Sequence, residues 1–128
     1  LTAFSTASKG RPEGTENRRV SCLARQSGIW IRKMDLKDRK ILITGANGGL
    51  GRAMAAAMAE HGAMLALCER TQALAEAAKA TLPEPARAQA HSFAADLTDP
   101  DAVAAMVSDC AATLQGLDGL VNNAAILT

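Results

Sequence analysis

A glycine-rich segment between an apolar run and a helix-like run constrains the fold of this 128-residue chain more than any other feature. The segment, residues 44–51, reads TGANGGLG and follows the apolar run at residues 41–43. Glycine permits positive φ and carries no Cβ, so a backbone rich in glycine can approach a diphosphate closely. The free N–H groups of the first helical turn and the positive end of the helix dipole then face the anion. The segment therefore predicts a nucleotide-phosphate site between a strand and a helix.

Strand-like and helix-like runs alternate from Met34 onward. The patterns predict strands at residues 40–44, 63–68, 89–95 and 117–122, and helices at residues 50–61, 71–82 and 99–115. Thr71 and Asp99, or Thr98 beside it, suit helix starts, and Gly62 suits a helix end. Short strands separated by helices of these lengths form βαβ units with right-handed crossovers. We therefore expect an α/β fold, a Rossmann-like doubly wound parallel sheet with strand order 3-2-1-4, truncated after the fourth strand.

The composition sets the kind of core. Hydrophobic residues make up 48% of the chain but aromatic residues only 2%, so Ala, Leu, Ile, Val and Met must fill the interior. No apolar run approaches the roughly 20 residues that a membrane-spanning helix needs. In the first helix, a 3.6-residue period predicts a buried stripe. Its members are Leu50, Ala53, Met54, Ala57, Met58 and His61.

Residues 1–33 differ from the rest in charge and pattern. They are rich in Ser, Thr, Gly and Arg and carry a net charge of +5, whereas the remainder carries −4. The chain begins with Leu, and Met34 stands just before the first regular pattern. We favour upstream sequence from a misplaced start, with a flexible basic tail and an organelle transit peptide as alternatives. We expect residues 1–33 to be a basic flexible extension outside the fold and residues 34–128 to form an acidic domain that binds no nucleic acid.

The cysteines and histidines give no metal pattern. Cys22, Cys68 and Cys110 are odd in number and form no CxxC pair, which favours reduced thiols in a cytoplasmic protein. His61 and His91 are 30 positions apart, with no carboxylate or thiol spaced to complete a metal site. We therefore expect neither a bound metal nor a membrane segment.

Polar residues end each later strand, where a nucleotide would lie. An acidic side chain about 20 residues after the glycine turn can accept both hydroxyls of an adenosine ribose, and Glu69 has that position. Arg70 beside it can instead pair with a 2′-phosphate. Glu69 favours NAD and Arg70 favours NADP, and a solvated ion pair remains an alternative to both.

The third and fourth strands end in two further candidates. Asp96 can accept from an exocyclic amino group while the backbone of Leu97 meets ring nitrogens, although the same residues also suit a turn and helix cap. Asn122 and Asn123 can bond to neighbouring backbone and stiffen a strand end beside a ligand, although an Asn pair also suits a turn.

These four segments, TGANGGLG, CER, ADL and NNAA, together resemble the short-chain dehydrogenase/reductase family over roughly residues 35–127. The resemblance implies a dinucleotide site for NAD or NADP, with NAD slightly favoured by Glu69. The residues that it places around the cofactor are Thr44, Gly45, Asn47, Gly49, Leu50, Gly51, Glu69, Arg70, Asp96, Leu97, Asn122, Asn123 and Ala124. It also implies that the parent enzyme interconverts an alcohol and a carbonyl by hydride transfer, and that the full-length parent is a homo-oligomer.

The sequence departs from the family pattern in three respects. Ala125 stands where the family usually has glycine, and Gly48 stands where many NADP-using members have a basic residue. The family's catalytic Ser and Tyr-xxx-Lys lie beyond the fourth strand, and this sequence has no Tyr, so no catalytic residue can be assigned. We expect a truncated cofactor-binding portion, with a short non-catalytic binding module or a non-functional remnant as alternatives. Because the fourth strand would be an unpaired edge, we expect the isolated chain to be marginally stable or to aggregate.

Overall fold

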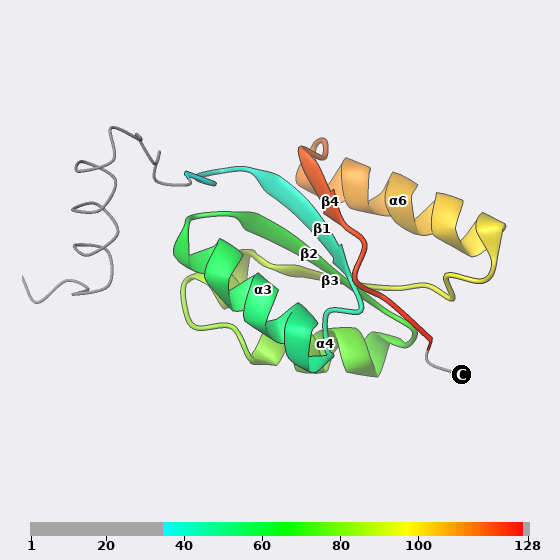
Figure 1. Ribbon diagram of the computed structural model, residues 1–128. Coiled ribbons are helices and arrows are strands. Elements are labelled where there is room, and N and C mark those ends of the chain that lie inside the picture. Colours follow the sequence, from blue (N-terminus) through cyan, green and yellow to red (C-terminus); the bar gives the residue numbers. More distant parts are fainter. Residues whose placement is uncertain (1–34, 127–128) are drawn as a thin grey trace, which may run out of the picture. The chain divides into compact units, whose positions relative to one another are not determined.

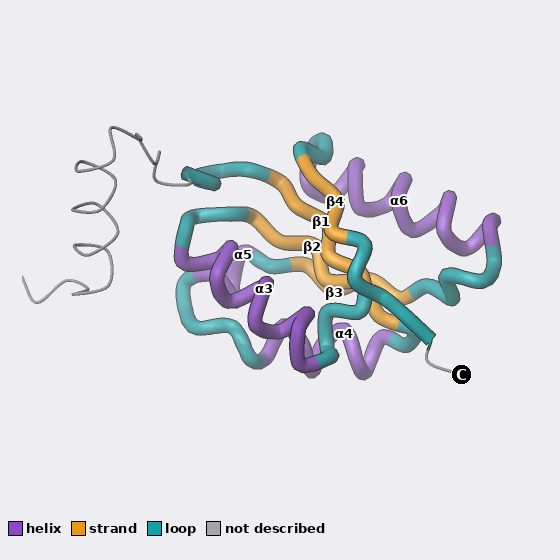
Figure 2. Tube along the Cα trace, viewed as in Figure 1, coloured by secondary structure: helices purple, strands orange, loops and turns teal. Residues whose placement is uncertain are grey.

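The computed structural model describes residues 35–126, which form one parallel sheet flanked by helices (Figures 1 and 2). The predicted extension at residues 1–33 lies outside the described residues. In chain order the elements are β1 Lys40–Thr44, α3 Gly49–Glu60, β2 Met64–Glu69, α4 Gln72–Ala80, α5 Ala86–Gln89, β3 His91–Ala94, α6 Pro100–Leu114 and β4 Gly119–Val121. The strand order is β3-β2-β1-β4, with every pairing parallel. The predicted Rossmann-like fold and its strand order are therefore confirmed.

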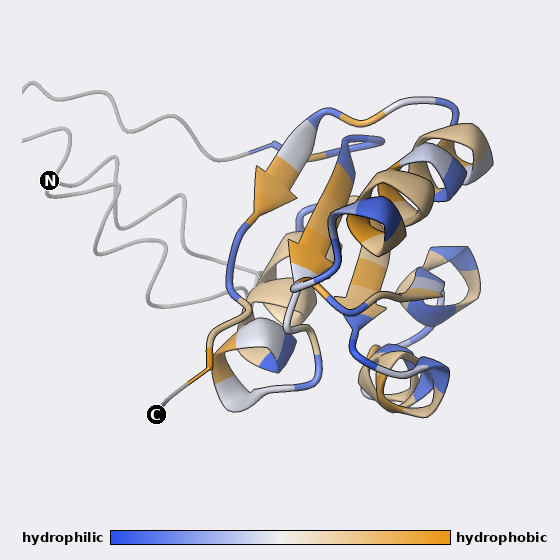
Figure 3. Cartoon of the chain, turned by 90° about the vertical axis from the view of Figure 1, so that its right-hand side faces the viewer, coloured by the Kyte–Doolittle hydropathy of each residue, from blue (hydrophilic) through white to orange (hydrophobic). Residues whose placement is uncertain are grey.

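The central strand β1 supplies side chains to both faces of the sheet, because successive strand residues point to opposite sides. Ile41 and Ile43 join a buried cluster with Ala55 of α3 and Ala78 of α4. Leu42 joins a second cluster with Met106 and other residues of α6. The helices α3 and α4 thus cover one face and α6 the other, and the strands between them are the most hydrophobic part of the fold (Figures 1 and 3). This double covering is why the strands read as continuous apolar runs.

The predicted helix boundaries agree with the observed caps. The Thr71 hydroxyl accepts a hydrogen bond from the Leu74 N–H at 3.3 Å, and the Asp99 carboxylate accepts from the first turn of α6. Gly62 follows α3 with φ of +87°, a conformation that glycine adopts without a Cβ penalty. The short helix α5 was not predicted, and it includes Gln89, which the predicted strand at residues 89–95 contained, so that the observed β3 begins only at His91.

The predicted buried stripe of α3 was wrong in its register. The buried residues are Gly51 and Ala55, and Met58 packs against the same core. Leu50, which headed the predicted stripe, is 66% exposed. The helix is rich in alanine, so several faces have similar hydropathy, and the close approach of Gly51 to the preceding turn decides which face is buried.

Candidate functional site

Two glycines of the turn are required by the backbone itself. Gly45 has φ of +64°, and a Cβ built there would lie 2.9 Å from the Cα of Ala124. A Cβ at Gly51 would lie 2.2 Å from the carbonyl oxygen of Gly45 and 2.9 Å from the Cα of Ala46. All three distances are below the 3.0 Å that Cβ contacts in proteins essentially always exceed, so these two positions exclude larger residues for reasons of packing alone.

Gly49 differs from them, because a Cβ built at that position has no described atom within 4 Å once its chain neighbours and the backbone of its own helix are set aside. It is the first residue of α3. The N-cap residue before it, Gly48, has no side chain that could cap the helix, and the first turn carries no acidic residue. The N–H groups of the first helical turn have no acceptor within a helix. The turn therefore presents free N–H groups, a positive helix end and open space at the same place.

Thr44 joins the turn to the segment after β4. Its hydroxyl donates to the carbonyl oxygen of Val121 and accepts from the N–H groups of Asn123 and Ala124, at 3.1 and 3.2 Å. The Asn123 side-chain amide donates to the carbonyl oxygens of Thr44 and Gly45, at 3.2 and 3.0 Å. The predicted bonding of the Asn pair to neighbouring backbone is therefore present through Asn123, and Thr44 braces the same turn from β1.

Glu69, at the end of β2, is bonded to the tip of the glycine turn. Its Oε1 accepts from the backbone N–H of Asn47 at 2.8 Å, and its Oε2 accepts from the N–H of Arg70 at 3.3 Å. The guanidinium of Arg52 donates through Nε and Nη2 to the side-chain oxygen of Asn47. Arg52 was not identified from the sequence, because nothing in the pattern showed that this side chain of α3 would reach back to Asn47. Among the described residues no ion pair joins Glu69 to Arg70, so the alternative of a solvated ion pair is not observed, and Glu69 contacts the Arg70 backbone instead.

Asp96 follows β3 and is held by the residue two positions later. Its Oδ1 accepts from the N–H of Thr98 at 2.9 Å and from the Thr98 hydroxyl at 2.7 Å. These bonds, with a smaller contribution from the positive charge of Arg70, lower the pKa of Asp96 below its ordinary value of 3.8. The carboxylate is exposed and bonded through only one of its oxygens, and Leu97 beside it is 41% exposed.

These strand ends enclose an open cleft of about 580 Å³ at the carboxyl edge of the sheet. It is lined by ten predicted site residues: Gly45, Gly49, Leu50, Gly51, Glu69, Arg70, Asp96, Leu97, Asn123 and Ala124. The lining residues that were not predicted are Gly48, Cys68, Ala95, Thr98, Ala125 and Ile126. Asn47 does not line the cleft, and its contacts are with Glu69 and Arg52.

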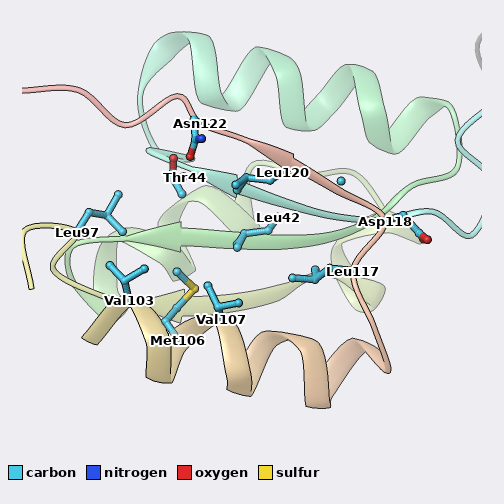
Figure 4. A pocket seen from close by; sticks show the side chains of 11 residues that line it. Leu42, Thr44, Leu97, Val103, Met106, Val107, Leu117, Asp118, Leu120 and Asn122 are labelled. Carbon is cyan, nitrogen blue, oxygen red and sulfur yellow. The ribbon is translucent and has the colours of Figure 1, made fainter. Parts of the chain in front are cut away.

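A second hollow, of about 510 Å³, lies between β4 and α6. Leu120 of β4 faces Val103, Met106 and Val107 of α6 across it (Figure 4). Leu120 is 57% exposed, and among the described residues no strand pairs with the outer edge of β4. The predicted site residues Thr44 and Asn122 line this hollow. Asn122 therefore does not line the first cleft, although Leu97 lines both hollows and Asn123, the next residue, lines the first cleft.

The described residues contain neither a metal-ligand cluster nor a long apolar helix. No three His, Cys, Asp or Glu side chains within residues 35–126 are placed to hold a metal ion. None of the helices in that range has the length and hydrophobicity to cross a bilayer.

Comparison with known proteins identifies the family. The family model described as short chain dehydrogenase matches residues 39–128. The 2-(S)-hydroxypropyl-CoM dehydrogenase 3 of Xanthobacter autotrophicus is 41% identical over 91 residues, which cover 71% of this chain and 35% of that protein. The levodione reductase of Leifsonia aquatica is 40% identical over 90 residues, covering 70% of this chain and 34% of that protein. The chain belongs to the short-chain dehydrogenase/reductase family, and it spans about a third of the length of these relatives.

Solved structures agree with this assignment. A 3-ketoacyl-(acyl-carrier-protein) reductase from Brucella melitensis complexed with NADH matches with a TM-score of 0.64 and 34% identity, over 72% of this chain and 36% of that one. An NAD+-bound xylitol dehydrogenase matches with a TM-score of 0.67 and 31% identity, over 73% of this chain and 35% of that one.

Proposed function

We propose that this chain forms the cofactor-binding part of an NAD(P)-dependent dehydrogenase or reductase. The observation that supports this most strongly is Gly49, because packing explains Gly45 and Gly51 but leaves Gly49 without a steric reason. A diphosphate against the first turn of α3 would supply that reason, since its oxygens would take the space that a side chain would fill. The solved relatives that are bound to NADH or NAD+ support the same ligand class.

Each strand end has a proposed role in holding the cofactor. We assign the diphosphate to Gly45, Gly49 and Gly51, with Asn47 and Leu50 nearby and Thr44 bracing the turn. The adenosine ribose is assigned to Glu69 and Arg70, and adenine to Asp96 and Leu97. The other ribose is assigned to Asn122, Asn123 and Ala124. Bound NAD(P) would supply or accept hydride, and the whole protein would interconvert an alcohol and a carbonyl. The 128 residues include no Tyr, so the proposal for this chain is cofactor binding.

Glu69 supports NAD as the preferred cofactor. A carboxylate fixed by the N–H groups of Asn47 and Arg70 would repel a 2′-phosphate and accept from a 2′-hydroxyl. Glu69→Ser removes the charge, so we expect affinity to move toward NADPH, measured by titrating wild type and variant with NADH and NADPH. An unchanged ratio of the two dissociation constants would remove Glu69 as the ribose reader.

Saturable binding tests the function itself. The full chain should bind NAD with one site in isothermal titration calorimetry, whereas nicotinamide mononucleotide, which lacks the adenosine half, should bind much more weakly. An equal response to both ligands, or to neither, would contradict the proposal. For the whole protein, the family resemblance predicts a homo-oligomer, which light scattering tests, and the cysteine pattern predicts a cytoplasmic location, which cell fractionation tests.

A further inference from the structure

The glycine turn is held at its tip by contacts that do not involve any glycine. Asn47 lies at that tip and is half-buried. Its N–H donates to Glu69 at 2.8 Å, and its side-chain oxygen accepts from two nitrogens of Arg52. A single residue is therefore fixed from β2 through its backbone and from α3 through its side chain.

We propose that Arg52 is a positioning residue, which acts through Asn47 to hold the glycine turn against Glu69 in the conformation that cofactor binding needs. The ligand part of this inference rests on the function proposed above. Arg52 comes directly after the last glycine of the motif, so its guanidinium ties the first turn of α3 back to the loop before it. A planar guanidinium that donates two N–H groups fixes direction as well as distance.

The consequence is a coupling between the diphosphate and ribose ends of the site. If Asn47 loses its side-chain partner, its backbone is freer to rotate, and the N–H that orients the Glu69 carboxylate is less often in place. The turn and the carboxylate then loosen together, because both depend on the position of residue 47. If Arg52 acted only through its positive charge, its loss would weaken diphosphate binding without disturbing the Asn47 N–H.

A double-mutant cycle separates these two modes of action. Arg52→Met keeps the length of the side chain without its donors, and Asn47→Ala removes the acceptor while keeping the backbone N–H. We expect each single variant to weaken NAD binding by about three- to tenfold, the size of effect that losing one ordinary exposed hydrogen bond has. The double variant should bind NAD with an affinity no lower than that of the single variant with the lower affinity. Arg87→Met is the matched control, because Arg87 is an exposed arginine that pairs with Glu84 away from the cleft.

Amide hydrogen exchange gives a readout that needs no ligand. In the unliganded full chain, Arg52→Met should speed exchange of the Asn47 amide by a similar factor, whereas Arg87→Met should leave it unchanged. Additive losses of affinity in the double variant, or unchanged exchange at Asn47, would overturn the inference. If wild type does not bind NAD, the proposed function fails, and the exchange of Asn47 still decides the role of Arg52.

Discussion

Alanine at Gly51 should destabilise the fold, whereas alanine at Gly49 should leave the fold intact and weaken NAD binding. At Gly51 the new Cβ would lie 2.2 Å from a backbone oxygen, which is 0.8 Å inside the 3.0 Å limit that Cβ contacts observe. Because the obstacle is backbone, relief requires moving the turn or the helix, at a cost of about 3 kcal/mol. For a domain of this size, that lowers the melting temperature by about 15 °C.

At Gly49 the new methyl group meets no described atom within 4 Å, and alanine is the better helix former by up to about 1 kcal/mol. The melting temperature should therefore stay within about 4 °C of wild type or rise. NAD affinity should nevertheless fall at least tenfold, about 1.4 kcal/mol, because the methyl group takes up space beside the diphosphate. Circular dichroism melts in dilute solution and calorimetric titration measure the two effects separately. Wild-type affinity in Gly49→Ala, or a wild-type melt in Gly51→Ala, would refute the reasoning.

Three further perturbations follow from the described residues. Thr98→Val removes the hydroxyl bond to Asp96, so the pKa of Asp96 should rise toward 3.8 in a carbon-detected NMR titration, and no change would show that the hydroxyl bond does not set this pKa. Burial raises the pKa of Cys68. Burial, with a smaller contribution from the charge of the nearby Cys68 thiolate, raises the pKa of Cys110 to about 11. Both thiols should thus resist alkylation at pH 8, as measured by peptide mass spectrometry, and fast labelling would contradict their burial. The stability that the protonated thiols contribute should be present below pH 9.0 and lost as the pH rises toward about 11, and a stability that does not change over this range would contradict the shift. Leu120→Lys places a charge on the open edge of β4 and should reduce concentration-dependent association in light scattering, whereas equal association would place the contact elsewhere.

The sequence predicted the sheet well because its signals are local and repeated. Each apolar run is bounded by a turn or cap residue, such as Thr71 or Asp99, and the alternation of periods fixes a parallel order. The orientation of α3 could not be read in the same way, because its many alanines give no strong periodicity. Its buried face is set by the contact of Gly51 with Gly45, which depends on the three-dimensional turn.

The site was predictable in outline and not in its contacts. Residues at the carboxyl ends of adjacent parallel strands must lie near one another, so Glu69 and Asp96 reach the same cleft. The bond between Asn47 and Glu69 joins residues 22 positions apart, and no spacing rule specifies it. Arg52 likewise became visible only once the direction of its side chain was known.

Amide chemical-shift mapping of NAD onto the labelled full chain tests the central claim most directly. We expect saturable chemical-shift changes that are largest at the N–H groups of Gly49, Leu50 and Gly51, with further changes at Glu69. Saturable changes confined to the hollow beside Leu120, or none at about 1 mM NAD, the weak end of specific binding, would contradict it.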